Sequence, residues 1–284
     1  MTDDRKIILK DSRVLSFAEY GDPGGLPVIG IHGMPGSRIE MKAFEKTALG
    51  AGVRVVAPER PGYGLSTPNP GGSLANYPLD VQELAGALRL DRFAVLAVSG
   101  GGPYGLACAS RLAQRLTAVV VVSGIGPLRL PGSTRSMARP NRFMFNLGRF
   151  SPGLVGFLLP RLLRSSLPSM NRQVQAGTSP VSSISPELFA IVAGDQAESI
   201  RNGGKGIAFD MKNLWQPWGF KLEDIKIKVT LRHGVSDDLA PAGLAQAVAG
   251  KLPNCDAYFY PGEGHVEAWL NHDQEIIQAI VSAA

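Results

Sequence analysis

The sequence predicts an α/β fold with a mostly parallel sheet covered by helices on both faces. Three observations indicate this fold. Short apolar runs that end in Gly, Pro or Ser recur along the chain, helical patterns lie between them, and the alternation is interrupted once, between residues 127 and 219. Alternating strands and helices build right-handed crossovers and therefore a parallel sheet. A length of 284 residues fits one large domain that carries an insertion.

The first half of the chain supplies six of the expected strands. Two β-patterns open it at 6–10 and 13–20, and the turn sequence GDPGG follows. The next four runs are too short and too β-branched for helices, so we expect buried parallel strands at 28–31, 53–57, 93–98 and 118–122. Helical patterns lie between them at 39–49, 81–90 and 104–116.

The second half resumes this alternation after an insertion. Between 127 and 219, proline and serine punctuate two apolar helical patches at 142–150 and 154–163. Strands at 227–231 and 257–260 and helices at 243–249 and 267–283 then follow, which completes eight strands. We therefore expect a core domain of residues 1–126 and 220–284, with a helical insertion of residues 127–219 over the sheet after the sixth strand.

Composition limits the class of protein. Hydrophobic residues make up 44% of the chain and charged residues 19%, which predicts a sizeable folded core. The N-terminal sequence MTDDRKIILKD shows no secretory signal, and no apolar stretch approaches the roughly 18 residues of a membrane span. Cys108 and Cys255 form no CxxC or metal pattern. These features predict a cytoplasmic protein, and no nucleic-acid-binding motif accompanies its basic charge.

A serine at a strand-to-helix turn is the strongest chemical signal in the sequence. The apolar run 93–98 leads into Ser99, three glycines and Pro103, and a helical pattern follows. A nucleophile on such a turn needs small residues two positions before and after it. Ala97 and Gly101 stand there, and we expect them to pack against each other. The positive end of the helix would then point at Ser99.

Other segments of the chain favour a nucleophile at Ser99 over two alternative interpretations of the turn. Alone, Ser99 and its glycines also fit a phosphate-binding loop or an ordinary tight turn. Ser123 likewise ends a strand, but Ile125 stands where the turn needs a small residue. Five segments, in this order, resemble the α/β-hydrolase family along nearly the whole chain: HGMPG at 32–36, RPGYGLS at 60–66, the turn at Ser99, GVSDDLAP at 234–241 and GEGH at 262–265.

The resemblance implies an α/β-hydrolase fold with a helical cap and a Ser–His–Asp triad. In this family the acid follows the seventh strand within G-x-x-D-x-x-x-P, which selects Asp237, with Asp238 as the alternative. His265 follows the last strand and keeps the chain order Ser, Asp, His. The backbone N–H groups of Met34 and Gly100 are the implied donors to a tetrahedral oxyanion.

The implied reaction is hydrolysis of a carboxylic ester of a small to medium, partly apolar molecule through an acyl-enzyme, without a metal or organic cofactor. Relatives use the same triad on amides, as in proline iminopeptidases, and on lactones or C–C bonds. A non-catalytic small-molecule receptor and a lyase or biosynthetic tailoring enzyme are alternatives from other classes. We expect the remaining histidines to be structural (His32, His233) or solvated inside the last helix (His272).

The insertion is expected to shape the substrate pocket. Phe143, Phe145 and Trp215 are candidate substrate contacts, although their helical spacing also fits the core of the insertion. Residues 127–186 hold eight arginines, no lysine and no acidic residue, in a chain of net charge +5. The favoured interpretation is a solvated basic face, and attraction of an anionic substrate or contact with an acidic membrane or partner surface is the alternative. The sequence indicates no oligomeric state.

Overall fold

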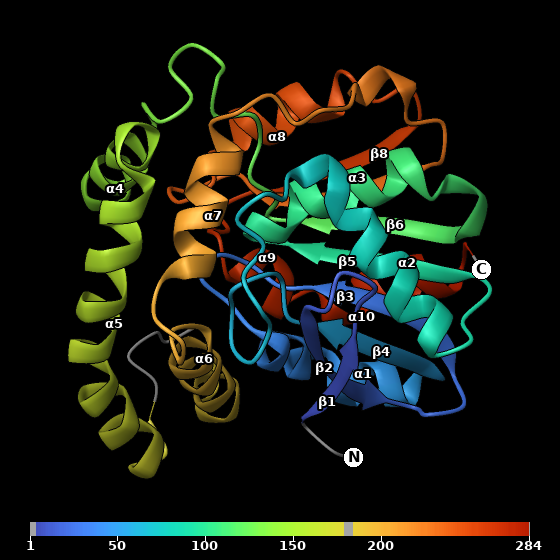
Figure 1. Ribbon diagram of the computed structural model, residues 1–284, viewed down its shortest axis with the longest axis horizontal. Helices are drawn as coiled ribbons and strands as arrows, with labels where there is room; N and C mark the ends of the chain where they lie inside the picture. The colour runs from blue at the N-terminus through green and yellow to red at the C-terminus, as the bar shows by residue number, and fades with distance from the viewer. Residues whose placement is uncertain (1–3, 179–183, 284) are drawn as a thin grey trace.

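A computed structural model describes residues 4–178 and 184–283 and contains one eight-stranded sheet (Figure 1). The strand order is β1-β2-β4-β3-β5-β6-β7-β8. β2 pairs antiparallel with β1 and β4, and every other neighbouring pair is parallel, so the predicted fold class is confirmed. The strands are β1 (Arg5–Ile8), β2 (Val14–Gly21), β3 (Leu26–Ile31), β4 (Val53–Pro58), β5 (Phe93–Val98), β6 (Leu116–Val122), β7 (Val229–Gly234) and β8 (Cys255–Tyr260).

Helices cover both faces of the sheet because its central strands are apolar on both sides. In β5, Phe93, Val95 and Ala97 face one core, and the alternate residues face the other. Helices α2, α3 and α8 pack on the first face, and α1, α9 and α10 pack on the second. These helices are α1 (Glu45–Gly50), α2 (Tyr77–Ala87), α3 (Gly102–Arg111), α8 (Ala242–Ala249), α9 (Glu267–Leu270) and α10 (Asp273–Val281), with short 3₁₀ helices η1 (Arg38–Phe44), η2 (Leu74–Asn76), η3 (Ser99–Gly101), η4 (Ala113–Arg115) and η5 (Leu222–Asp224).

Several predicted helices have different limits in the structure, among them 81–90, which is α2 at Tyr77–Ala87. The segment 39–49 divides into η1 and α1, and α3 ends at Arg111 because Leu116 already pairs with Phe93 in the sheet. The C-terminal helix is interrupted at His272, which lies between α9 and α10. His272 stacks on Tyr260 at 3.7 Å between ring centroids and hydrogen-bonds to Glu263. Its side chain is 26% exposed, so it is only partly solvated, and it does not lie inside a helix as predicted.

Four helices lie between β6 and β7, at the left of Figure 1. They are α4 (Arg139–Phe150), α5 (Pro152–Gln175), α6 (Pro186–Ser199) and α7 (Lys205–Leu214), and residues 179–183 lie outside the described residues. α5 packs against the other three, and a separate apolar core joins α7 to Tyr63 of the loop after β4. Within the described parts of the chain, no helix is both long and apolar enough to cross a membrane.

Candidate active site

Ser99 lies at the turn between β5 and α3, at the carboxyl edge of the sheet. Its φ of 52° is in the left-handed region, which residues with a side chain rarely occupy. The strand therefore ends abruptly at Val98, and α3 begins at Gly102 with Pro103 in its first turn. This backbone holds the side chain of Ser99 at the end of the strand, as the sequence predicted for a nucleophile.

The glycines after Ser99 allow two backbone segments to approach it. A β-carbon on Gly101 would lie 2.4 Å from the carbonyl oxygen of Ile31, and one on Gly100 would lie 2.6 Å from the β-carbon of Met34. Ala97 also faces a glycine of α3, since its β-carbon lies 2.6 Å from the position that a β-carbon on Gly105 would take. The contact expected between Ala97 and Gly101 stays a prediction.

Gly101→Ala is expected to lower the free energy of unfolding by about 1 to 3 kcal/mol, because the added methyl group overlaps backbone that cannot rotate away. Urea unfolding would measure the loss. Gly86→Ala is the matched control: it lies in α2, faces open space, and should raise stability by about 0.4 to 1 kcal/mol. Equal stability of the two alanine variants would contradict this account of the turn.

A chain of hydrogen bonds joins the three residues predicted as a triad. Ser99 Oγ lies 2.9 Å from His265 Nε2, and His265 Nδ1 lies 2.7 Å from Asp237 Oδ2. Asp237 follows β7 and His265 follows β8, so loops at the carboxyl ends of three parallel strands meet here. Ser123, after β6, donates its hydroxyl to the carbonyl oxygen of His265 at 2.8 Å and fixes the histidine loop.

Asp237 is held as a carboxylate by groups on three sides. Its Oδ1 accepts hydrogen bonds from the backbone N–H groups of Leu239 and Ala240, and His233 Nε2 lies 3.2 Å from its Oδ2. Burial alone would raise the pKa of Asp237, but the hydrogen bonds from His233 and His265 outweigh it and hold the pKa well below its usual range. The neighbouring Asp238 is exposed, which favours Asp237 as the acid.

The two predicted oxyanion donors lie side by side next to Ser99. The Met34 nitrogen lies 3.0 Å from the position that a β-carbon on Gly100 would take. Arg60 holds the loop that contains Met34, since its guanidinium donates to the carbonyl oxygens of His32 and Gly33 at 3.1 and 2.7 Å. His32 accepts the N–H of Arg60 through Nε2, consistent with the expected bracing role.

Arg60 is itself held by a buried residue that the sequence did not single out. Asp210 of α7 accepts two hydrogen bonds from Arg60, at 2.6 and 2.7 Å, and two more from the hydroxyls of Tyr63 and Tyr104. Arg60 and Asp210 are both almost fully buried. The insertion therefore fixes the loop that contains Met34 through a buried ion pair. The motif RPGYG marked one side of this pair, but no motif marks Asp210.

Comparison with known proteins identifies the family. The model described as the "Alpha/beta hydrolase family" matches residues 28–279, which include Ser99, Asp237, His265 and both predicted oxyanion donors. The chain belongs to the alpha/beta hydrolase family. A Bacillus subtilis relative, uncharacterized hydrolase YcgS, is 34% identical over 109 residues, 38% of this chain and 38% of that protein. Uncharacterized hydrolase YNR064C of Saccharomyces cerevisiae is 24% identical across 98% of this chain and 95% of that protein.

A solved structure shows the same fold. A thermophilic esterase from Thermogutta terrifontis, in a malate-bound structure, superimposes with a TM-score of 0.67 at 21% identity, over 99% of this chain and 97% of that chain. The chain therefore shares its fold with that esterase.

Ser99 of this alpha/beta hydrolase faces a cavity of about 220 Å³. Apolar side chains form much of its wall, including Ile191 and Val192 of α6 and Trp269 of α9. Two buried acids, Glu40 and Asp195, also line it. Phe143, Phe145 and Trp215, the candidate substrate contacts of the insertion, do not line this cavity. Phe145 belongs to the core of the insertion, Phe143 is exposed, and Trp215 donates its indole N–H to the carbonyl of Phe145 at 2.9 Å, so this expectation is corrected.

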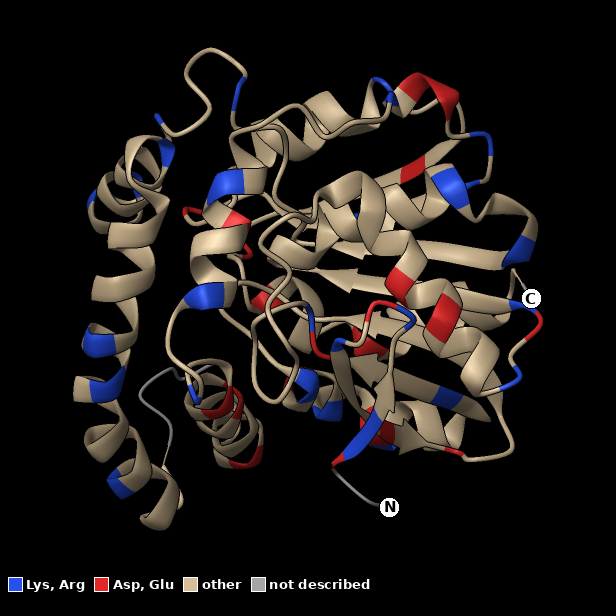
Figure 2. Ribbon diagram, viewed as in Figure 1, with Lys and Arg blue, Asp and Glu red and all other residues tan. Residues whose placement is uncertain are grey.

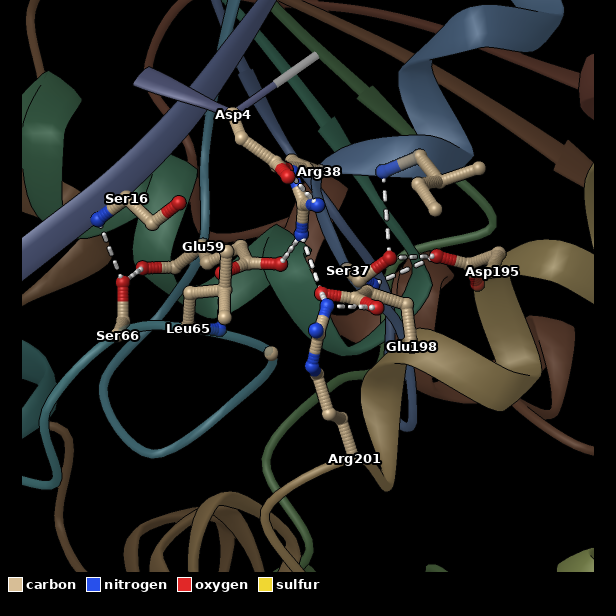
Figure 3. A network of polar contacts seen from close by, with 12 residues as sticks. Asp4, Ser16, Ser37, Arg38, Glu59, Leu65, Ser66, Asp195, Glu198 and Arg201 are labelled. Atoms are coloured by element: carbon tan, nitrogen blue, oxygen red, sulfur yellow. Dashed lines mark hydrogen bonds and ion pairs between the residues drawn. The ribbon is translucent and has the colours of Figure 1, made fainter. Parts of the chain in front are cut away.

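Helix α6 reaches the cavity because polar contacts fasten it to η1 (Figure 3). Asp195 Oδ1 accepts hydrogen bonds from the backbone N–H and the hydroxyl of Ser37, both at 2.7 Å. One turn further along, Glu198 accepts a hydrogen bond of 2.7 Å from Arg38, which also pairs with Glu59. The insertion is thus attached to Ser37 and Arg38, which follow the loop that contains Met34.

The alpha/beta hydrolase should lose stability as pH rises from about 4 to about 7 because of Asp195. Burial raises the pKa of Asp195 to about 7, although the Ser37 hydrogen bonds lower it, whereas an unfolded aspartate titrates near 3.9. The folded protein then binds the extra proton in this window, so the free energy of unfolding falls by up to about 1.4 kcal/mol per pH unit.

Urea unfolding at pH 5 and pH 7.5 would measure this fall. Asp195→Asn should show a smaller fall in the free energy of unfolding between these two pH values. Glu187→Gln, a change at an exposed position on the same helix, should show the same fall as the wild type. Glu40 and Glu59 face the same region, and burial raises the pKa of each, so some pH dependence remains in Asp195→Asn. An unchanged fall in Asp195→Asn would contradict the assignment to Asp195.

Proposed function

We propose that this alpha/beta hydrolase is a serine hydrolase that cleaves a carboxylic ester of a small to medium, partly apolar molecule. The supporting observation is the hydrogen-bond chain from Ser99 through His265 to Asp237. His265 takes the Ser99 proton as Oγ attacks the ester carbonyl, and Asp237 stabilises the imidazolium. The alcohol leaves with that proton, and water activated by His265 then releases the acid from the acyl-enzyme.

The proposal gives two further parts of the chain a role. The N–H groups of Met34 and Gly100 donate to the oxyanion of the tetrahedral intermediate, each with an effect of about 2.7 to 4 kcal/mol on the barrier. Residues 127–219 form a cap over the core of 1–126 and 220–284. The side chains of α6 in the cavity wall support this role, since they place the insertion against the reacting serine.

Labelling with a fluorophosphonate, followed by intact mass measurement and a panel of short p-nitrophenyl esters, tests the proposal. We expect one label per chain and ester turnover, both lost in Ser99→Ala. Ser123→Ala, which removes the other serine at the end of a strand together with its hydrogen bond to the His265 loop, should still take up one label, at a lower rate. Labelling that persists in Ser99→Ala would refute the assigned nucleophile. A wild type without label or turnover would favour a non-catalytic receptor.

Within the ester series, an acyl group with a free carboxylate should react more slowly than its neutral counterpart. Much of the cavity wall is apolar, Glu40 and Asp195 lie buried in it, and no lysine or arginine among the described residues lines it, so a carboxylate placed there loses its water without a cationic partner. We expect kcat/KM for monomethyl succinate to be at least about tenfold below that for methyl butanoate. Measurement at 0.05 and 0.5 M NaCl tests the alternative that the arginines of 127–186 attract an anionic substrate. That alternative requires the succinate ester to lose more activity at high salt than methyl butanoate does.

A further inference from the structure

The outer faces of α4 and α5 combine arginine with exposed large apolar side chains. All eight arginines of 127–186 are exposed: Arg129, Arg135, Arg139, Arg142, Arg149, Arg161, Arg164 and Arg172. In Figure 2 the ribbons of α4 and α5 carry basic residues and no acidic ones. Five large apolar side chains on the same two helices are 45 to 79% exposed: Phe143, Phe150, Leu154, Phe157 and Leu162.

The exposed fractions place these apolar side chains on parts of the two helices that turn away from the protein. In α5, Leu154 and Phe157 are three residues apart and share a face, and Leu162 lies on a neighbouring face. Phe143 and Phe150 of α4 are seven residues apart and therefore share a face. The inner sides of α5 already pack against α4, α6 and α7. The outer faces thus form an amphipathic surface about 36 Å long, from the 24 residues of α5.

The arginine side chains interleave with the apolar ones and do not pair with acids on this surface. Arg161 stacks over the ring of Phe157 at 3.4 Å, and Arg149 lies over Phe150 at 5.4 Å. Such side chains keep their cationic ends in water while their stems and the rings remain available to an apolar layer. A second copy of the chain would bring the same eight positive charges onto its partner, which disfavours self-association through this surface.

We propose that the outer surface of α4 and α5 binds the surface of an anionic lipid bilayer, with its phenylalanine and leucine side chains inserted at the level of the headgroups. Interfacial helices combine arginine or lysine with exposed Phe and Leu in this way, and anionic lipids attract the basic residues. The proposal is independent of the catalytic assignment. The cavity at Ser99 is walled by α6, which α5 contacts, so the bilayer would lie near the cap without blocking the triad loops.

Co-sedimentation of the full chain with vesicles tests the proposal. We expect binding to phosphatidylcholine vesicles that contain 30% phosphatidylserine at 0.1 M NaCl, and at least tenfold weaker binding to pure phosphatidylcholine or at 0.5 M NaCl. Arg142→Gln/Arg161→Gln/Arg172→Gln should lower the partition coefficient roughly 100-fold. Phe143→Gln/Phe157→Gln/Leu162→Gln, all exposed positions, should lower it at least tenfold.

A matched control removes the same charge from the core domain. Lys221→Gln/Lys226→Gln/Lys228→Gln changes three exposed lysines and should keep at least a third of the wild-type partition coefficient. Equal loss in this control, or no preference of the wild type for anionic vesicles, would overturn the proposal. Sedimentation velocity without vesicles completes the test. A dimer that the three apolar substitutions dissociate would show that a second copy covers this surface, and the proposal would fail.

Discussion

Asp237→Asn is expected to lower kcat for ester hydrolysis by about 10⁴-fold with the fold intact. An asparagine side chain can still accept the N–H groups of Leu239 and Ala240 through its oxygen. Its NH₂ group would then face His265 Nδ1 and donate to it. The imidazole proton would move to Nε2, where it faces Ser99, and the histidine could no longer accept the serine proton.

Asp238→Asn is the matched control, because Asp238 is exposed and adjacent in sequence. We expect its kcat to stay within about twofold of the wild type. Both variants should be compared by steady-state kinetics on one p-nitrophenyl ester and by thermal unfolding. If Asp238→Asn were the inactive variant, the acid would have been assigned to the wrong neighbour, and the short contact between Asp237 and His265 would have no catalytic meaning.

The strands were predictable because their signals are local. Each parallel strand is an apolar run bounded by turn residues, and 93–98 agrees with β5 in both limits. The turn at Ser99 was also predictable, since the strand, the glycines and Pro103 are adjacent in sequence. Asp237 and His265 required the resemblance to a family, because neither is close to Ser99 along the chain, and the contact between them forms only when β7 and β8 are placed side by side.

The insertion was the least predictable part. In α6, the polar residues Asp195 and Ser199 are buried together with apolar ones. They obscure the helical pattern, in which apolar residues recur about every three to four positions on the buried face. Asp195 and Asp210 carry no motif, and their partners are 158 and 150 residues away, at Ser37 and Arg60. The role of a buried charged residue follows from the group that it pairs with, and a partner so distant along the chain is identified only from the three-dimensional structure.

Asp210→Asn should lower the free energy of unfolding by about 3 to 5 kcal/mol, because it leaves the charge of Arg60 buried without a counter-ion. Chemical denaturation would measure the loss, and Asp224→Asn, at an exposed position, should stay within about 0.5 kcal/mol of the wild type. A loss below about 1 kcal/mol in Asp210→Asn would mean that the guanidinium of Arg60 had found another partner or water.

The double variant Arg60→Met/Asp210→Asn separates stability from catalysis. It removes both charges, so it should be more stable than Asp210→Asn alone. The hydroxyls of Tyr63 and Tyr104 donate to different oxygens of Asp210, and an asparagine can accept one of them through its oxygen and donate to the oxygen of the other through its NH₂ group. Its kcat should nevertheless stay low, because the hydrogen bonds from Arg60 to the carbonyls of His32 and Gly33 are gone. Recovered stability without recovered kcat would show that the fold tolerates removal of the ion pair, whereas catalysis needs Arg60 to hold the loop that contains Met34 beside Ser99.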